Sequence, residues 1–317
     1  MNLLLIGTGR MARAYAPVLA AHTVGIIAVG RSKEGSAQFQ KDTGIDTTSG
    51  GITGWRKTAS SIPTHAIVAV DDEASPHVAQ ELIDIGVTHI LLEKPGALSR
   101  KELLDLQKKA QKSGAAVHIG YNRRFLASVQ KAQEIIKADG GVISFHFEFN
   151  ERTTQPERIA AMDIPEKTVE HWFVANSTHV VDLALFLAGN PLALSGFTAK
   201  GPLWATQDHA TLFTGAGMTD RDVPFSYYAN WEIDGPWLVE IQTSKRKLIL
   251  NPLEKLTAEK DGTIDEVAYD NSLDTKFRPG LYREVESFFN DLRDLKTLDE
   301  QIQHFDWYEK ICPHEPQ

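Results

Sequence analysis

The first 120 residues alternate between short apolar runs and segments with a helical pattern, and this alternation constrains the fold most strongly. The apolar runs are residues 3–6, 24–29, 66–70, 89–92 and 116–119. Helical patterns occupy residues 11–20, 32–41, 76–85 and 99–112 between them. Strands that are apolar along their whole length are buried on both faces, and intervening helices make such strands parallel. The alternation therefore predicts a parallel sheet that is covered by helices on both faces.

Local signals mark the ends of several of these helices. Ser99 with Glu102 three residues later forms a capping-box pattern, which predicts a helix start at residue 99. Gly86 and Gly114 stand where helix C-caps are expected.

The pattern changes after residue 120. Helices are expected at 122–137, 172–188, 281–295 and 298–311. Residues 141–149 alternate with period two, as a half-exposed strand does, and further strands are expected at 211–214, 226–231, 238–243 and 247–250. Residues 153–167 contain two prolines and are expected to form a loop over the site. We therefore predict an α/β chain with domains 1–120 and 121–317. The second domain is built on a mainly antiparallel sheet, and its closing helices can pack back on the first domain.

Composition excludes several classes of protein. The 317 residues carry a formal net charge of −9, which is not the basic footprint of a nucleic-acid-binding protein. Cys312 is the single cysteine, so a disulfide within the chain is excluded and a reducing compartment is favoured. We find no signal-peptide pattern and no apolar run of about 18 residues that could form a membrane helix. The expectation is a cytoplasmic protein that binds neither nucleic acid nor a membrane.

A glycine turn follows the first apolar run and opens the first helix. Gly7 allows a tight turn, Gly9 lets the backbone approach a pyrophosphate, and Ala12 is small enough for the helix to pack on the strand. The free N–H groups at the helix N-terminus suit two negative phosphates. The turn predicts a dinucleotide site that includes Gly7, Thr8, Gly9, Arg10 and Met11. The alternative is a tight turn that binds no ligand.

The end of the second strand bears on the choice of dinucleotide. NAD-binding chains usually have an acid about twenty residues after the glycine turn, where it binds the ribose 2′-hydroxyl. This chain has Arg31, Ser32 and Lys33 at that point and no acid before Glu34. A guanidinium suits a 2′-phosphate. We therefore predict NADP as the cofactor, with NAD as the alternative. Arg31 and Lys33 could also be solvated loop charges.

Three further segments carry a resemblance to a known family. They are Glu93-Lys94-Pro95, the run 120–125 (GYNRRF), and a helix that contains His179 and Asp182. Together with the glycine turn, they resemble the Gfo/Idh/MocA family of oxidoreductases along the whole chain. The resemblance implies an N-terminal Rossmann domain and a C-terminal domain with an open, mainly antiparallel sheet. It also implies hydride transfer between a nicotinamide and a sugar, a cyclitol or a sugar nucleotide. The sheet would form a homodimer or homotetramer.

The resemblance also assigns roles to particular residues. Lys94 would lie beside the reacting carbonyl or hydroxyl group, aimed by a cis peptide bond before Pro95. His179 would transfer the proton. Asn122 and His77 would lie near the cofactor. The cofactor site would then comprise the glycine turn, Arg31, Ser32, His77, Glu93, Lys94, Pro95 and Asn122, and no residue is assigned to a metal.

One position departs from the family's pattern. The family's dehydrogenases often have an aspartate four residues before the histidine, where this chain has Ala175. Asn176 follows it and can hydrogen-bond a hydroxyl, but an amide cannot relay a proton. The departure leaves three hypotheses open. The chain is an oxidoreductase working with Lys94 and His179, a non-redox enzyme with tightly bound NAD(H), or a non-catalytic NADP-binding protein.

Candidate substrate contacts follow from the same segments. Trp172 precedes the histidine helix and offers an aromatic face to a sugar ring, and Asn176 offers its amide. Arg123 could bind an anionic group of the substrate. The alternative is that Arg123 and Arg124 both form interdomain salt bridges.

Overall fold

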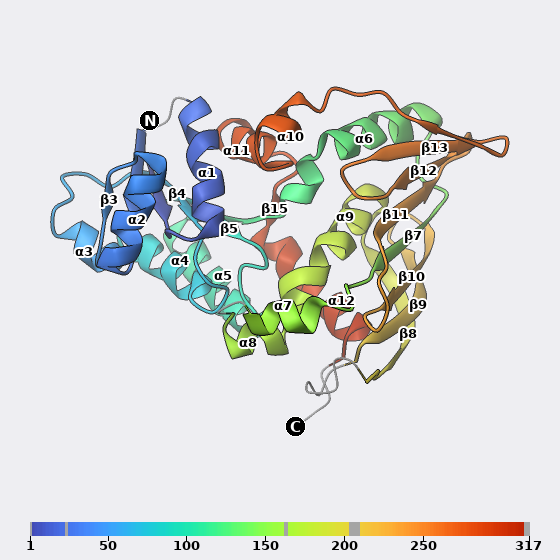
Figure 1. The fold of residues 1–317 in the computed structure, drawn as a ribbon, viewed down its shortest axis with the longest axis horizontal. Coiled ribbons are helices and arrows are strands. Elements are labelled where there is room, and N and C mark those ends of the chain that lie inside the picture. The colour runs from blue at the N-terminus through green and yellow to red at the C-terminus, as the bar shows by residue number, and fades with distance from the viewer. Residues whose placement is uncertain (1, 23–24, 162–163, 203–209, 314–317) are drawn as a thin grey trace. The chain divides into compact units, whose positions relative to one another are not determined.

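The computed structural model describes residues 2–22, 25–161, 164–202 and 210–313 (Figure 1). The chain divides into two compact units. The first comprises Met1–Asn122 and Asp274–Gln303, and the second comprises Arg123–Leu273 and His304–Gln317. The first unit is therefore built from two separate stretches of chain. Among the described residues, no helix is long and apolar enough to span a membrane.

The first unit contains a sheet of seven strands in its described part, in the order β15-β6-β5-β4-β1-β2-β3. All neighbouring strands pair in parallel except the edge strand β15, which is antiparallel to β6. The central strands are buried apolar runs, as predicted. The strands are β1 (Asn2–Ile6), β2 (Gly25–Val29), β3 (Thr47–Thr48), β4 (His65–Val68), β5 (His89–Glu93), β6 (Ala116–Gly120) and β15 (Lys296–Thr297).

Helices alternate with these strands along the chain. They are α1 (Arg10–Ala21), α2 (Lys33–Thr43), α3 (Gly51–Arg56), α4 (Ser75–Asp84) and α5 (Arg100–Ser113). The predicted capping box is present at α5. Ser99 Oγ accepts from the backbone N–H of Glu102, and the Glu102 carboxylate accepts from the backbone N–H of Ser99. The later helix α11 (Leu281–Asn290) packs against α1.

The second unit contains a sheet of eight strands in its described part, in the order β14-β13-β12-β11-β7-β10-β9-β8. Every neighbouring pair is antiparallel except β7 and β10. The strands are β7 (Ser144–Phe149), β8 (Pro191–Ala199), β9 (Leu212–Thr219), β10 (Pro224–Asn230), β11 (Trp237–Gln242), β12 (Lys247–Leu250), β13 (Leu256–Lys260) and β14 (Thr263–Glu266). The predicted fold class, a Rossmann domain followed by a domain with a mainly antiparallel sheet, is confirmed.

Helices cover one face of this sheet. The helix α9 (Thr178–Ala188) packs on β7 and β11, and α6 (Ala127–Asp139) packs on β12 and β13 (Figure 1). The strand β7 alternates between buried and half-buried residues, as its period of two predicted. Its buried phenylalanines, Phe145, Phe147 and Phe149, form the centre of the core together with Phe213 and Tyr227.

The structure corrects four predictions of local structure. The expected loop at 153–167 contains α7 (Gln155–Ala161) and the start of α8 (Glu166–Glu170), with 162–163 outside the described residues. Its prolines misled the prediction because Pro156 lies in the first turn of α7 and Pro165 is the N-cap of α8, positions where no helical N–H bond is lost. The helix expected at 281–295 ends at Asn290.

The helix expected at 172–188 is not uniform. Residues Phe173–Ser177 form a π-helix, and α9 follows directly from Thr178. Regular helical spacing of three therefore does not describe the geometry from Asn176 to His179. The helix predicted at 122–137 is likewise divided into a 3-10 turn, Asn122–Phe125, and α6.

Candidate functional site

The glycine turn joins β1 to α1 in the first unit. Gly7 has φ of +117°, and a Cβ there would lie 2.1 Å from the backbone oxygen of Ala69 on the neighbouring strand. Its N–H donates to Val29 O at 2.9 Å, which ties the turn to β2. Only glycine fits both the backbone conformation and the close approach at this position.

Gly9 differs from Gly7 in its surroundings. It is the N-cap of α1 with φ of −79°, and among the described residues no heavy atom lies within 4 Å of a Cβ built on it. The space beside the helix N-terminus is therefore open. Arg10 is exposed, Thr8 and Met11 are half-buried, and Ala12 is fully buried. An open approach to unpaired helix N–H groups is the geometry that a pyrophosphate requires, so these residues fit a dinucleotide.

The end of β2 leads into a second helix N-terminus. Arg31 and Ser32 are both exposed, and Ser32 Oγ caps α2 by accepting from Gly35 N at 3.0 Å. Gly30 packs so closely that a Cβ would lie 2.7 Å from Thr8 Cγ2. The second helix start therefore lies beside the glycine turn. An exposed guanidinium and a helix N-terminus together favour an anionic group.

Lys94 follows β5, and the Lys94–Pro95 peptide bond is cis, as the resemblance implied. Removal from water lowers the pKa of the Lys94 ammonium, while the negative charges of Asp72 and Glu93 raise it in part. Pro95 is buried, and its carbonyl accepts from Gln301 Nε2 at 2.8 Å. Lys94 is thus a lysine whose neutral form is more accessible than in water.

A buried chain of hydrogen-bonding groups lies behind Lys94. Tyr15 Oη lies 2.7 Å from Glu93 Oε1 and 3.1 Å from Glu284 Oε2. Burial, and then the charge of Glu93, raises the pKa of Glu284 well above its ordinary value. The single phenol hydrogen can serve only one of these carboxyl groups at a time, and burial raises the pKa of Glu93 as well as that of Glu284. The chain ends at the residue that precedes Lys94.

The other two predicted cofactor residues of the first unit lie in different settings. His77 is exposed in the first turn of α4. Asn122 is buried, and its Nδ2 donates to the carbonyl of Pro279 at 2.9 Å. Asn122 therefore holds the second stretch of the first unit against the end of the first stretch.

In the second unit, two predicted substrate residues converge on a carboxylate that the sequence analysis missed. Trp172 Nε1 donates to Glu151 Oε1 at 3.2 Å, and Asn176 Nδ2 donates to the same oxygen. Glu151 is 6% exposed. Burial raises the pKa of its carboxyl group to about 7, against the opposing effect of these hydrogen bonds. Glu151 lies two residues after the end of β7, and an acid close behind a half-buried strand was the available signal.

His179 lies in the same unit, in the first turn of α9. Its ring centroid is 5.9 Å from that of Trp237 in β11. Trp237 Nε1 in turn donates to the carbonyl of Asn150 at 3.0 Å, next to Glu151. Trp172 and Asn176 therefore share Glu151 as their acceptor, while His179 stands against Trp237, which binds the residue before Glu151. Lys94 belongs to the first unit.

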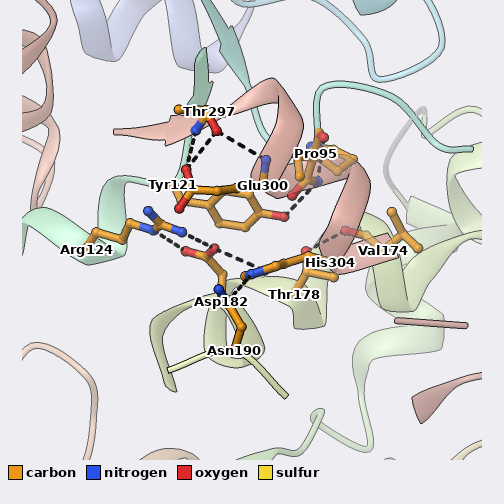
Figure 2. Close-up of polar contacts among 11 residues, drawn as sticks. Pro95, Tyr121, Arg124, Val174, Thr178, Asp182, Asn190, Thr297, Glu300 and His304 are labelled. Carbon is orange, nitrogen blue, oxygen red and sulfur yellow. Dashed lines mark hydrogen bonds and ion pairs between the residues drawn. The ribbon is translucent and has the colours of Figure 1, made fainter. Parts of the chain in front are cut away.

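Both arginines after β6 form ion pairs inside the second unit. Arg124 binds Asp182 through Nε and Nη2, each at 2.7 Å, and both side chains are buried. Figure 2 shows this pair with His304 beside the carboxylate, at 3.9 Å from Asp182 Oδ1. Arg123 Nη1 lies 2.9 Å from Glu254 Oε1. An anionic substrate group would have to compete with Glu254 for Arg123.

Comparison with known proteins addresses the first unit directly. Residues 1–121 match a family model described as the oxidoreductase family with an NAD-binding Rossmann fold, GFO_IDH_MocA. A curated relative, 2,7-anhydro-N-acetylneuraminate hydratase of Escherichia coli K12, is 28% identical over 103 residues. This alignment covers 32% of the chain and 27% of the relative's length.

Solved structures match the fold over nearly the whole chain. UDP-N-acetylglucosamine 3-dehydrogenase from Acidithiobacillus ferrooxidans is 16% identical with a TM-score of 0.76, over 98% of this chain and 96% of that one. The WlbA dehydrogenase from Bordetella pertussis, solved with NADH and UDP-GlcNAcA, is 16% identical with a TM-score of 0.73, over 98% and 95%. The predicted resemblance is therefore confirmed, and residues 1–121 carry the NAD-binding Rossmann domain of the Gfo/Idh/MocA oxidoreductase family.

Proposed function

We propose that the chain is an NADP-dependent oxidoreductase that transfers a hydride between the nicotinamide and a CH–OH or carbonyl carbon of a sugar nucleotide. The observation that carries this proposal is Lys94, which follows β5 in an NAD-binding Rossmann unit and has a pKa lowered by burial. The open turn at Gly9 supports the cofactor. The substrate class is supported by the two dehydrogenases of like fold, which are named for or bound to UDP-sugars.

The bound nicotinamide supplies the redox step, and the protein residues handle the oxygen and its proton. A carbon gives up hydride only as its hydroxyl loses a proton, so a base must lie within reach. Lys94 holds the developing oxyanion as a cation, or takes the proton in its neutral form. His179 transfers the proton because an imidazole titrates near neutral pH. Trp172 and Asn176 hold the sugar by aromatic contact and by hydrogen bonding to a hydroxyl group.

Replacement of Lys94 tests this assignment. We expect Lys94→Ala to lower kcat by about 100-fold or more while the affinity for NADPH stays unchanged, because general acid–base groups contribute about 100-fold to 10,000-fold. Reduced nicotinamide absorbance measures turnover with a panel of UDP-sugars, and nucleotide fluorescence measures binding. Lys101→Ala, an exposed lysine of α5, is the matched control. Full activity of the Lys94 variant would show that the lysine takes no part in the reaction.

The preference for NADP is tested at Arg31. We expect Arg31→Ala to weaken NADPH binding roughly tenfold and to leave NADH binding unchanged, because a charge-assisted bond to the 2′-phosphate is lost. Arg56→Ala, an exposed arginine of α3, is the control. Parallel titrations with both nucleotides decide the question. Equal effects on NADPH and NADH would show that Arg31 does not read the 2′-phosphate.

A second candidate function is a non-redox reaction on a sugar with the dinucleotide kept bound. The curated relative favours it, since that protein is named as a hydratase. The two candidates differ in net consumption of cofactor. Conversion of a sugar with no net change in free NADPH or NADH, and with nucleotide retained through purification, would establish the second candidate over the first.

We also propose that the chain forms a homodimer or homotetramer through the open face of the second sheet. Phe197 in β8 and Tyr228 in β10 both pair with Thr214 of β9, so their side chains lie on the same face. They are 78% and 38% exposed. Large apolar side chains gathered on one exposed face favour a protein contact.

A further inference from the structure

The backbone turn that carries Lys94 is bound by a buried amide from a distant part of the chain. Gln301 Nε2 donates to the carbonyl oxygen of Pro95 at 2.8 Å, and Pro95 directly follows Lys94. We propose that Gln301 is a positioning residue, which orients this turn so that the Lys94 side chain is presented to the reacting oxygen. The inference rests on the proposed function, because it assigns a further residue to the reaction in which Lys94 takes part.

The turn runs from Glu93 to Gly96. Its ends are joined by the N–H of Gly96, which donates to the carbonyl of Glu93 at 3.0 Å. Gly96 also lies so close to β6 that a Cβ would be 2.6 Å from Ile119 Cδ1. Proline has no N–H, so its carbonyl is the polar backbone group by which Pro95 can be held. Gln301 binds this group and thereby fixes the part of the turn that follows Lys94.

The start of the helix α12 (Leu298–Ile311) determines where Gln301 lies. The strand β15 pairs with the end of β6, and α12 follows β15 directly. Thr297 and Glu300 form a capping box, in which Thr297 Oγ1 accepts from Glu300 N at 3.1 Å and Glu300 Oε2 accepts from Thr297 N at 2.7 Å (Figure 2). The helix therefore begins at a defined residue beside β6, and Gln301 belongs to its first turn.

Gln301 has a second acceptor and an unpaired oxygen. Its Nε2 lies 3.2 Å from Tyr121 Oη, and an amide nitrogen has two hydrogens for the two acceptors. Among the described residues, Gln301 Oε1 is buried with no hydrogen-bond partner. A buried oxygen without a partner lowers stability, and an apolar side chain would avoid this loss. The chain has a donor for Pro95 at this position although its oxygen is left unpaired.

Gln301 can act on the reaction only through its neighbours, because its side chain is fully buried. The path is short, since the bound carbonyl belongs to the residue next to Lys94. Removal from water lowers the pKa of the Lys94 ammonium, so its ionisation depends on how far the turn keeps the side chain from solvent. Misplacement of a reacting group by about 1 Å can lower a rate about 100-fold. Loss of the Gln301 bond should therefore change both the rate and the ionisation of Lys94.

The first test replaces the amide with an apolar side chain of similar size. The wild type, Gln301→Met and Gln303→Met are assayed with NADP⁺ and a panel of UDP-sugars. We expect Gln301→Met to lower kcat about 10-fold to 100-fold. The KM for the sugar nucleotide and the affinity for NADPH should not change, because a fully buried side chain contacts neither ligand. Gln303 is exposed on the same helix, so Gln303→Met is the control and should keep wild-type kinetics.

Thermal unfolding should place Gln301→Met close to the wild type. The lost bond to Pro95 is offset by removal of the unpaired Oε1. A double-mutant cycle then shows whether Gln301 acts through Lys94. In the Lys94→Ala background, Gln301→Met should lower the residual rate less than about twofold, because the group that it positions is gone. An equal loss in both backgrounds would overturn the proposal, as would wild-type kcat in Gln301→Met.

A third measurement needs no substrate. Reductive methylation with isotope-labelled formaldehyde marks lysine amines, and the resonance missing from Lys94→Ala reports the ionisation of Lys94. We expect Gln301→Met to raise the pKa of Lys94 towards the ordinary value of a lysine, because the side chain gains contact with water. Gln301→Asn keeps the amide on a shorter side chain. It should give an intermediate titration, and it serves if the methionine variant does not fold.

The outcomes separate this inference from the proposed function. A Lys94 titration that is unchanged in both Gln301 variants would overturn the positioning role, even if the rate falls. Absence of redox turnover in the wild type would overturn the proposed function. The titration of Lys94 would still decide whether Gln301 orients that side chain.

Discussion

Buried carboxyl groups set the charge balance of both units at the scale of single residues. Glu284 is fully buried in the first unit beside Glu93, and Glu151 is buried in the second unit. Burial disfavours the charged form, so in each case the pKa is raised. Asp182 forms a buried ion pair with Arg124, whereas neither Glu284 nor Glu151 forms such a pair within the part of the chain that the structure describes. Both carboxyl groups are therefore easier to protonate than a carboxyl group in water.

Glu151 gives a stability signature that needs no substrate. Its pKa is about 7 in the folded chain against an ordinary value of 4.5, so between these pH values the folded state holds a proton that the unfolded state releases. Stability from this group is therefore lost as pH rises through about 7, by about 3 kcal/mol in total. We expect Glu151→Gln to remove this loss, so that its stability relative to wild type is greater at about pH 8 than at about pH 5.

Urea unfolding at the two pH values measures this difference. Glu134→Gln, which removes an exposed carboxylate of α6 that pairs with Lys131, should shift the free energy of unfolding equally at both pH values. A stability of Glu151→Gln that runs parallel to the wild type would mean that the carboxyl group has an ordinary pKa.

Sequence patterns could predict the residues of the first unit's site better than those of the second. Lys94 and Gly7 belong to short motifs in which neighbouring residues share the chemistry, so local sequence is informative. Glu151 was missed because its partners, Trp172 and Asn176, are separated from it by α7 and α8. The raised pKa depends on burial by those segments, and no local pattern around Glu151 reports that burial.

At the scale of elements, the turn between β1 and α1 contains two glycines with different roles. Gly7 is required by the fold, because its positive φ and the backbone of Ala69 exclude a side chain. Gly9 is not required by the fold, because its φ is ordinary and its Cβ position is open. The glycine motif indicated this turn from local sequence, whereas local sequence could not show that α7 would form or that residues 173–177 would become π-helical. Those features depend on contacts with other elements.

The two glycines should therefore respond differently to alanine. We expect Gly7→Ala to lower the free energy of unfolding by roughly 2 kcal/mol or more, from backbone strain and the close contact with Ala69 O. Gly9→Ala should change stability by less than about 0.5 kcal/mol, yet weaken NADPH binding more than about tenfold by filling the space for the pyrophosphate. Thermal unfolding and fluorescence titration distinguish the two effects. Unchanged nucleotide affinity in Gly9→Ala would show that the dinucleotide does not approach this turn.

At the scale of the whole molecule, the first unit is interrupted by the second. Residues 1–122 supply the parallel strands and most helices, and residues 274–303 supply α11 and the edge strand β15. The returning stretch is not peripheral, since Glu284 completes the chain to Tyr15 and Phe288 packs against His65. The closing helices were expected to be able to pack back on the first domain, but hydrophobic patterns could not identify which residues would do so.

Residues 1–122 should be stably folded only when residues 274–303 are also present. We expect a fragment of residues 1–122 to lack a cooperative thermal transition, because Tyr15 and His65 lose buried partners on α11. Residues 1–122 joined to 274–303 by a short Gly/Ser linker should melt cooperatively and bind NADPH, since Asn122 and Pro279 are already hydrogen-bonded neighbours. Calorimetry of both fragments decides this. Equal melting of the two would make residues 274–303 dispensable.

The interruption also bears on how the chain is made. Synthesis runs from the N-terminus, and domains tend to fold as they leave the ribosome. The nucleotide-binding unit cannot be finished in that order, because Glu284 and the edge strand β15 emerge only after residues 123–273. Until residues 274–303 have been translated, the early strands lack β15, and the Tyr15 hydroxyl lacks its contact with Glu284. A shortened messenger that stops within the second unit would thus yield a chain whose nucleotide-binding unit is incomplete, even though its glycine turn is intact.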